Sequence, residues 1–354
     1  MRVSVVIPCF NGERFLAQAI RSVLEQSFSP LDVVVVDDGS TDSSRSIACR
    51  FGDLVVLHET SHAGARAARN TGARLACGEA IMFLDADDVL GPGVLEALVS
   101  ALRREPAGIA LGPWRRLVRD EDGEEGVGRW VSRPPSCARR VPGDDELASW
   151  LTGWYHPPCA VLWSRTAFDL AGGWDETLRP GLNDDGDIMM RALARNTPVV
   201  YAEDEDAVSY YRRNPHGSRS SMRNTQAGLK ARLYVLARLA DELERHGTMD
   251  RYQLPMTLAL EAVASDAEAV APQVADACRQ VARVRGGPRW RNELHLLARG
   301  ARMASASVSE IVLGSLAVVK GADQRPAHEE VSFGLDRGRD GRSAGHMHIQ
   351  EVRP

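Results

Sequence analysis

The chain has 354 residues, a formal net charge of −5, 44% hydrophobic residues and 26% charged residues. This composition is typical of a globular protein, and it has no basic excess that would indicate a nucleic-acid partner. The length allows one large domain or two smaller ones. Six cysteines are scattered without a Cys-x-x-Cys pair. Their spacing argues against a structural zinc site or a disulfide framework and favours a reducing cytosol.

No segment of the sequence is typical of a signal peptide or a membrane-spanning helix. The apolar run Val3–Ile7 leads directly into Pro8 and polar residues, unlike a signal peptide. The longest late apolar stretch, Ile311–Val319, is far shorter than the roughly 20 residues that span a bilayer. It could lie on a membrane surface or pack on the core. We therefore predict a cytoplasmic protein and leave open a peripheral contact at the inner face of a membrane.

The N-terminal part of the chain alternates between strand patterns and helical patterns. The β-branched run at 3–7 suits a strand buried on both faces. Apolar residues recur at helical spacing over 12–25, and a second buried strand follows at 33–36. Strand, helix, strand at this spacing predicts a parallel sheet. The alternation continues with strands at 54–57, 80–84 and 109–111 and helices at 64–76 and 92–103.

Acidic residues follow two of these strands. Asp37 and Asp38 end the second strand, and Asp85, Asp87 and Asp88 follow the strand at 80–84. The carboxyl ends of parallel strands meet at one edge of a sheet, so the two clusters should converge on one cleft. Crowded, partly desolvated carboxylates have raised pKa values and become favourable around a divalent cation. A polar turn with Asp88 as a helix cap is the alternative, and the convergence of two clusters argues against it.

Two further polar segments point to the same edge of the sheet. Pro8-Cys9-Phe10-Asn11 follows the first strand, and Arg69 and Asn70 lie on the helix before the strand at 80–84. The Arg69 guanidinium could pair with a phosphate or with one of the acids.

Four motifs resemble those of family 2 glycosyltransferases, which have a GT-A fold. Their order and spacing match over roughly the first ninety residues, and together they are specific although each alone is weak. The motifs are Pro8-x-Phe10-Asn11, Val36-Asp37-Asp38-Gly39-Ser40-x-Asp42, Ala68-Arg69-Asn70-x-Gly72 and Leu84-Asp85-x-Asp87-Asp88.

The resemblance implies a nucleotide-sugar site in this half of the chain, with Mg²⁺ or Mn²⁺ as cofactor. By analogy Asp37 hydrogen-bonds the base, Asp85 lies near the ribose and Asp87 holds the metal, which neutralises the diphosphate as it departs. The residues expected to bind the donor are Pro8, Phe10, Asn11, Asp37, Asp38, Ser40, Arg69, Asn70, Asp85 and Arg212.

A second acidic segment follows Gly172-Gly173-Trp174-Asp175-Glu176. Acids at the start of a helix can be explained by the helix dipole alone. The family resembled here has an acidic pair at this point, usually Glu-Asp, and this chain has Asp184-Asp185. The resemblance implies that Asp185 is the catalytic base, with Asp184 or Asp187 as the fallback. Such a base takes the proton of an acceptor hydroxyl, and direct displacement with one carboxylate predicts inversion at the anomeric carbon.

The segment Tyr210–Ser218 closes the predicted catalytic part. Arg212 is a candidate phosphate partner. His216 is a candidate metal ligand by resemblance, although it lies a residue or two later than the commonest spacing, and an exposed loop histidine is the alternative. His156, before two prolines, could face the acceptor or belong to a structural turn.

The rest of the chain carries no recognisable chemistry. Residues 119–142 read as a hairpin or loop insertion near the acceptor side, and leucines recur at helical spacing beyond Met222. Four arginines between 283 and 291 surround Trp290, which suits an anionic membrane surface or a solvated helix end. Oligomeric state cannot be inferred from these features.

We therefore predict an α/β protein with a Rossmann-like GT-A domain over 1–222, a helical C-terminal appendage over 223–320 and a disordered tail over 321–354. The predicted function is an inverting sugar transfer from a nucleoside-diphosphate sugar, with UDP as the expected nucleotide, to a saccharide or lipid-linked acceptor in surface polysaccharide or glycolipid assembly. The alternatives are nucleotidyl transfer, a dinucleotide dehydrogenase and a catalytically silent sugar-nucleotide-binding module. The first two alternatives require a glycine-rich loop after the first strand, and this chain has Pro8-Cys9-Phe10-Asn11-Gly12 there instead.

Overall fold

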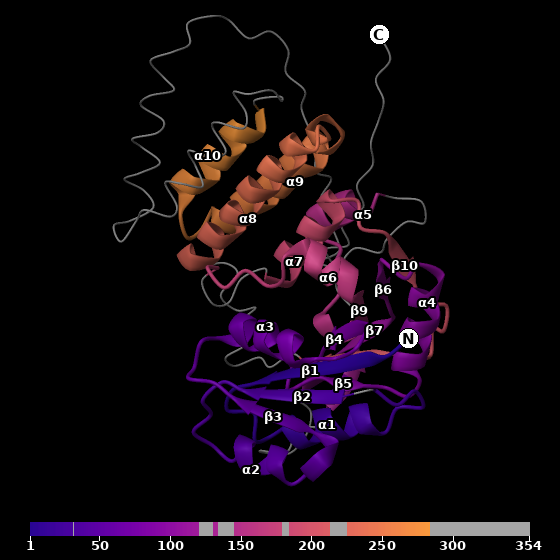
Figure 1. The fold of residues 1–354 in the computed structure, drawn as a ribbon. Coiled ribbons are helices and arrows are strands. Elements are labelled where there is room, and N and C mark those ends of the chain that lie inside the picture. The colour runs from indigo at the N-terminus through magenta and orange to yellow at the C-terminus, as the bar shows by residue number, and fades with distance from the viewer. Residues whose placement is uncertain (31, 120–129, 134–144, 179–183, 213–224, 284–354) are drawn as a thin grey trace, which may run out of the picture.

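The computed structural model describes residues 1–30, 32–119, 130–133, 145–178, 184–212 and 225–283 (Figure 1). In this part of the chain no helix is both long enough and apolar enough to cross a membrane.

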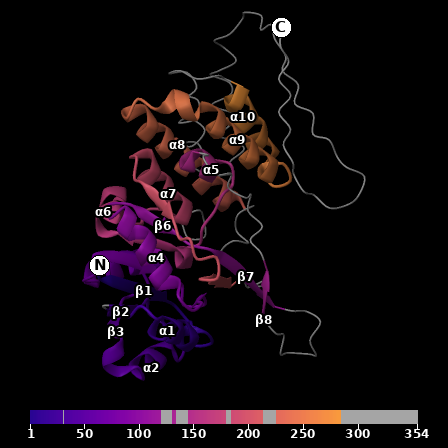
Figure 2. The ribbon, with the colours of Figure 1, turned by 90° about the vertical axis from the view of Figure 1, so that its right-hand side faces the viewer.

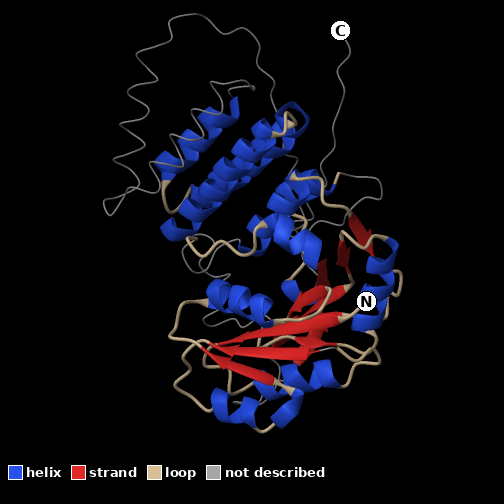
Figure 3. Ribbon diagram, in the orientation of Figure 1, coloured by secondary structure: helices blue, strands red, loops and turns tan. Residues whose placement is uncertain are grey.

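A seven-stranded sheet forms the centre of the α/β part (Figure 3). Its strand order is β10-β6-β9-β4-β1-β2-β3, and every strand is parallel to the others except β9. The predicted, mostly parallel sheet is therefore confirmed. The strands are β1 (Val3–Cys9), β2 (Asp32–Asp37), β3 (Val56–Glu59), β4 (Ala80–Phe83), β6 (Ile109–Leu111), β9 (Val161–Ser164) and β10 (Val199–Tyr201).

Helices cover both faces of this sheet (Figure 1). On β1, Val5 and Ile7 pack into the core on one face and Val6 into the core on the other, as the two-residue period of a strand requires. The first core is completed by α1 (Leu16–Leu24), α2 (Ser44–Cys49) and α4 (Val94–Arg104), and the second by α3 (Ala65–Leu75), α6 (Arg165–Ala171) and α7 (Asp184–Ala194).

A second, four-stranded sheet has the order β5-β11-β7-β8. Its strands β7 and β8 are antiparallel and project from the α/β part (Figure 2). Of the hairpin or loop insertion predicted at 119–142, the structure describes Arg119, which ends β7, and the strand β8, since residues 120–129 and 134–142 lie outside the described residues. The strands are β5 (Val89–Leu90), β7 (Trp114–Arg119), β8 (Trp130–Arg133) and β11 (Ser209–Arg212).

In the part of the chain that the structure describes, the predicted helical appendage contains α8, α9 and α10, which lie on the far side of α6 and α7 from the sheet (Figure 1). Their apolar side chains belong to the same core as α3, α6 and α7. Several predicted features lie outside the described residues: the domain boundary at 222, the arginines after 283, the stretch Ile311–Val319 and the tail after 320. The division into domains therefore stays a prediction. The helices are α5 (Glu146–Leu151), α8 (Gln226–Arg245), α9 (Met249–Ala267) and α10 (Pro272–Arg283).

Two element starts differ from the sequence prediction. The helix predicted from Pro92 begins at Val94, because Gly93 has a φ of +76° and cannot be helical. The strand predicted from Leu54 begins at Val56, because Gly52–Leu54 forms a 3-10 turn. The short elements α2, α5, β5, β10 and β11 were not predicted.

Candidate active site

The acids that end β2 organise two neighbouring loops. The carboxylate of Asp37, which is buried, accepts a hydrogen bond from the Ser40 backbone N–H at 3.1 Å. The buried Asp38 carboxylate accepts hydrogen bonds from Thr60 Oγ1 and from the backbone N–H groups of Ala63 and Gly64, each at 2.7 Å. Asp38 thus fixes the loop that leads into α3, and its predicted contact with the donor stays a prediction.

The loop after β1 is joined to the loop after β2. Asn11, at a φ of +50°, donates its backbone N–H to Ser40 Oγ at 2.9 Å and accepts the Thr41 N–H on Oδ1 at 2.9 Å. Phe10 is 47% exposed and packs against the His62 ring, with 4.1 Å between ring centroids. Pro8 is buried inside β1 opposite Val36, so it shapes the start of this loop.

The acids after β4 differ in burial. Asp85 and Asp87 are partly exposed, whereas Asp88 is buried and accepts the Arg212 backbone N–H on Oδ1 at 2.8 Å. Burial, and then the charges of Asp87 and Asp85, raise the pKa of Asp88 well above its ordinary value. The alternative of Asp88 as a helix cap is wrong, because α4 begins at Val94 and Gly93 occupies the cap position.

Arg69 holds the first of these acids from α3. Its side chain is 1% exposed, and Nη2 lies 2.5 Å from Asp85 Oδ1. The guanidinium also lies over the Trp174 ring, 4.4 Å from its centroid. Of the two partners expected for Arg69, a phosphate or an acid, this structure contains the acid.

Arg212 holds the backbone of the same acidic loop from β11. Its Nε donates to the Asp87 carbonyl oxygen at 2.6 Å and its Nη2 to Gln18 Oε1 at 2.8 Å. The guanidinium lies over the Phe15 ring, 4.2 Å from its centroid. Burial lowers the pKa of Arg212, and the nearby carboxylates Asp87 and Asp88 act against that shift.

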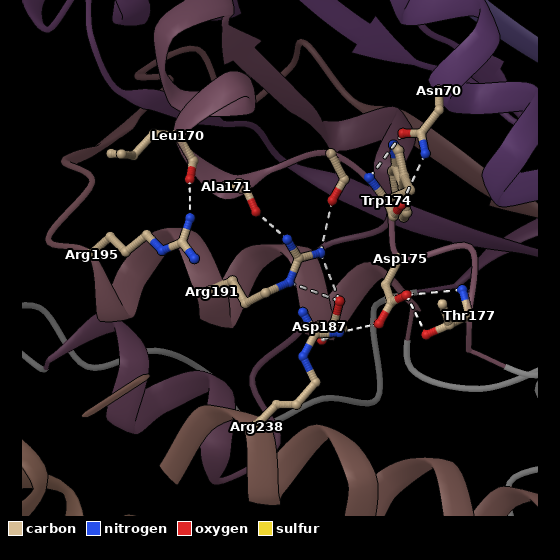
Figure 4. Close-up of polar contacts among 11 residues, drawn as sticks. Asn70, Leu170, Ala171, Trp174, Asp175, Thr177, Asp187, Arg191, Arg195 and Arg238 are labelled. Atoms are coloured by element: carbon tan, nitrogen blue, oxygen red, sulfur yellow. Dashed lines mark hydrogen bonds and ion pairs between the residues drawn. The ribbon is translucent and has the colours of Figure 1, made fainter. Parts of the chain in front are cut away.

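Asn70 connects α3 to the Gly-Gly-Trp-Asp-Glu segment (Figure 4). Its Oδ1 accepts the Trp174 N–H at 2.9 Å, and its Nδ2 donates to the Trp174 carbonyl at 2.9 Å and to Glu176 Oε1 at 2.7 Å. Gly172 and Gly173 precede this contact with φ values of +79° and +68°, and a Cβ at Gly173 would come within 3.0 Å of Asn70 Oδ1. The two glycines are therefore required where α6 turns toward Asn70.

The acidic helix α7 presents its carboxylates to different surroundings. Asp185 Oδ2 accepts a hydrogen bond from the Tyr155 hydroxyl at 2.9 Å. Asp187 is 2% exposed and is bound by Arg191 Nε and Nη2, at 3.0 and 2.7 Å, with Arg238 Nη1 3.8 Å away (Figure 4). These contacts favour a structural role for Asp187, and its fallback role as base stays a prediction. Asp184 begins α7, and its side chain lies outside the described part of the structure.

Acids from two distant segments act on one tyrosine. Burial raises the pKa of Tyr211, and the negative charges of Asp88, Asp185, Asp85 and Asp87 add to the rise. The acids after β4 and the acid on α7 therefore lie near the same phenol, although about a hundred residues separate them in the sequence. The predicted convergence of Asp37 and Asp38 with the acids after β4 stays a prediction.

Sequence reasoning missed the aromatic residues beneath this site. The Trp114 ring makes edge contacts with Tyr155 and with Tyr211, at centroid distances of 5.8 and 6.1 Å. The run Trp154-Tyr155-His156 before two prolines, in a chain with 6% aromatic residues, was the available signal. His156 itself is buried, between Trp154 and Tyr201, which favours its structural reading.

The described residues do not hold a metal by themselves. Among them, no group of three or more His, Cys, Asp or Glu side chains is arranged to bind an ion, and His216 lies outside them. Mg²⁺ is commonly held by one or two carboxylates together with substrate phosphates and water. The partly exposed carboxylates of Asp85 and Asp87 fit that donor set.

Comparison with solved structures shows the fold of the chain. The chain resembles TarS residues 1–349 of S. aureus in complex with UDP-GlcNAc, with a TM-score of 0.51 and 18% identity over 92% of this chain and 93% of that one. It also resembles the mannosyltransferase PcManGT of Pyrobaculum calidifontis in complex with GDP-Man and Mn²⁺, with a TM-score of 0.50 and 20% identity over 92% and 88%. The fold is GT-A, as predicted.

Sequence comparison matches part of the chain to one family. Residues 4–153 match the model of glycosyl transferase family 2. Glycosyltransferase GlyA of Streptococcus pneumoniae is 25% identical over 274 residues, which are 73% of this chain and 38% of GlyA. The predicted resemblance to family 2 glycosyltransferases is confirmed over residues 4–153, and the chain spans less than two fifths of GlyA.

Proposed function

We propose that the chain transfers a sugar from a nucleoside-diphosphate sugar, with UDP as the expected nucleotide, to a hydroxyl of a saccharide or lipid-linked acceptor, with inversion. Surface polysaccharide or glycolipid assembly is the proposed setting. The observation that carries the proposal is that acids from two segments meet one aromatic cluster. Asp185 accepts a hydrogen bond from Tyr155, Trp114 contacts both Tyr155 and Tyr211, and the charges of Asp85, Asp87 and Asp185 raise the pKa of Tyr211. This arrangement provides a donor-side acid cluster and an acceptor-side acid in one site.

The donor side is assigned to the loops after β1, β2 and β4. TarS was crystallised with UDP-GlcNAc and PcManGT with GDP-Man, which supports a nucleotide-sugar donor for this chain. We assign Asp37 to the base, Asp85 to the ribose and Arg212 to the phosphates, with Arg69 keeping Asp85 in place. Phe10, Asn11 and Ser40 lie on the joined loops and complete the proposed donor site.

The metal site is assigned to Asp87, with His216 as a further ligand. A divalent cation bound there would neutralise the diphosphate and stabilise it as the leaving group. The Mn²⁺ in the PcManGT complex supports this assignment. The part played by the chain is to hold the acidic loop still, which Arg212 does through the Asp87 carbonyl oxygen.

The base is assigned to Asp185, with Asp184 next to it as the alternative. Asp185 lies in the first turn of α7, where its carboxylate accepts a hydrogen bond from the Tyr155 hydroxyl. A carboxylate there can take the proton of an acceptor hydroxyl while the oxygen attacks the anomeric carbon. One base and direct displacement give inversion of configuration.

The first experiment is a panel of UDP-, GDP- and dTDP-sugars tested for binding and for slow release of the nucleoside diphosphate, with and without Mn²⁺. We expect one donor to be bound and hydrolysed, and we expect loss of Mn²⁺ or Asp87→Asn to abolish the hydrolysis. Asp185→Asn should retain donor affinity within about twofold while transfer falls by roughly 10²–10⁴-fold. Asp53→Asn, an exposed acid in the turn before β3, is the control. Binding of no nucleotide-sugar, with or without metal, would contradict the proposal.

A further inference from the structure

The segment between α5 and β9 places one hydroxyl group against the proposed base. Tyr155 follows the end of α5, where the Trp154 N–H donates to the Ser149 carbonyl at 2.9 Å. The Tyr155 hydroxyl then donates to Asp185 Oδ2 at 2.9 Å. Thirty positions of sequence separate these two residues, so this contact is made by the fold and not by a local turn.

The Tyr155 ring is held by other rings on two sides. Trp114, on β7, lies at 5.8 Å between centroids with an interplanar angle of 87°. Trp150, on α5, lies at 6.0 Å with an angle of 65°. Both contacts are edge-to-face, the geometry that aromatic pairs prefer. The direction of the Tyr155 hydroxyl is therefore set by packing that is independent of Asp185.

We propose that Tyr155 is a positioning residue for catalysis, which fixes the orientation of the Asp185 carboxylate and keeps it ionised. The inference rests on the proposed function, in which Asp185 is the base. A hydrogen bond to the charged form of a carboxylate favours that form, and a base held in one orientation loses less freedom when the acceptor arrives.

The charges around Tyr155 keep it a hydrogen-bond donor. Burial raises the pKa of the Tyr155 phenol well above its ordinary value, and the carboxylates of Asp185 and Asp85 and the Tyr211 hydroxyl add to the rise. The phenol therefore stays protonated over the whole range in which a carboxylate base titrates. On α7, the other described acid, Asp187, is paired with Arg191 and does not compete for Tyr155.

The test is Tyr155→Phe, which keeps the ring and removes the hydroxyl. We expect transfer kcat to fall roughly tenfold at neutral pH with unchanged donor affinity, since one charge-assisted hydrogen bond is lost. The acidic limb of the kcat profile should move up by about one pH unit, because the charged form of Asp185 loses a donor and its pKa rises. A role confined to packing would leave that limb in place.

Tyr252→Phe is a matched control. The Tyr252 hydroxyl donates to Asp145 Oδ2 at 2.9 Å, the same kind of hydrogen bond at the same length, between α9 and the start of α5. Both variants lose one such bond, so both should lose comparable stability. Only Tyr155→Phe should change the pH profile. Equal pH profiles for wild type, Tyr155→Phe and Tyr252→Phe would overturn the inference.

A second variant retains the hydroxyl and so protects the test against misfolding. Site-specific 3-fluorotyrosine at position 155 is nearly isosteric and has a more acidic phenol, hence a stronger donor, so the acidic limb should move down in pH. Asp185→Asn is measured in parallel. If that variant transfers sugar as fast as wild type, the assignment of the base is wrong; if it is inactive while both Tyr155 variants keep the wild-type profile, only the present inference is wrong.

Discussion

Arg69 and Asn70 are adjacent on α3 and make different polar contacts. The Arg69 side chain points to Asp85 after β4, whereas the Asn70 side chain is bonded to Trp174 and Glu176. Both were predicted to bind the donor. The contacts of Asn70 favour a different task, which is to hold the segment that leads toward α7.

Asn70→Asp separates these two tasks. Oδ1 can still accept the Trp174 N–H, but the donor to the Trp174 carbonyl is lost and a negative charge faces Glu176. We expect the free energy of unfolding to fall by about 1–3 kcal/mol, measured by urea denaturation. Donor affinity, measured by calorimetry, should change less than about twofold if Asn70 acts only on this segment. A large loss of affinity for the nucleotide-sugar at unchanged stability would instead support the original prediction that Asn70 binds the donor.

At the scale of elements, α8 contacts α7 and the Gly-Gly-Trp-Asp-Glu segment through arginines. Arg238, on α8, is ion-paired with Asp175 and lies 3.8 Å from Asp187 (Figure 4). Arg195, just after α7, is ion-paired with Glu242 on α8. Arg191 joins Asp187 to the carbonyl groups of Ala171 and Gly173. The helical appendage thus supports the helix that carries the proposed base.

Arg238→Met tests whether this support matters for catalysis, with Arg232→Met as the matched control. Arg232 is also on α8, but its partner Asp266 is on α9, inside the appendage. Arg238→Met removes the ion pairs with Asp175 and Asp187, and Arg232→Met removes the ion pair with Asp266. Each variant should lower stability by about 1–2 kcal/mol. Arg238→Met alone should lower transfer kcat, by about threefold to thirtyfold. Equal kcat values for the two variants would show that α8 does not act on the site.

At the scale of the whole molecule, one core runs from the sheet into the appendage. It contains Val6 of β1, Phe83 of β4, Ile188 of α7, Leu236 of α8 and Val281 of α10. The domain division predicted from the sequence cuts through this core. If either part unfolds, the apolar side chains that the other part packs against it become exposed to water, which destabilises that other part.

We therefore expect both parts to unfold in one transition. Six of the seven tryptophans precede residue 175, so fluorescence reports mainly on the α/β part, whereas ellipticity at 222 nm reports strongly on α8–α10. The two signals should give the same urea midpoint. Separate midpoints would favour two independent domains with a boundary near the predicted position.

Much of the fold could be predicted because its first half has strong patterns. Buried strands such as 33–36 are short apolar runs bounded by turn residues, and both acid clusters follow from them. The strands β5, β10 and β11 are only 2, 3 and 4 residues long and owe their pairing to distant partners, which no local pattern reveals. Asp185 could be predicted as a site residue because it belongs to a local motif. Tyr155 could not, because its contact with Asp185 joins positions thirty residues apart.

The position of β9 in the sheet has a consequence for synthesis on the ribosome. Strands β3-β2-β1-β4 are complete once Phe83 has emerged, but β4 pairs on its other side with β9, which begins at Val161. At about 5–20 residues per second, roughly 80 further residues take some 4–16 s. During that interval the nascent chain presents the fully apolar strand Ala80–Phe83 as an open edge, the kind of edge that recruits other chains. We therefore expect protection of that strand during synthesis, by a chaperone or by the ribosome surface, to reduce aggregation of the nascent chain.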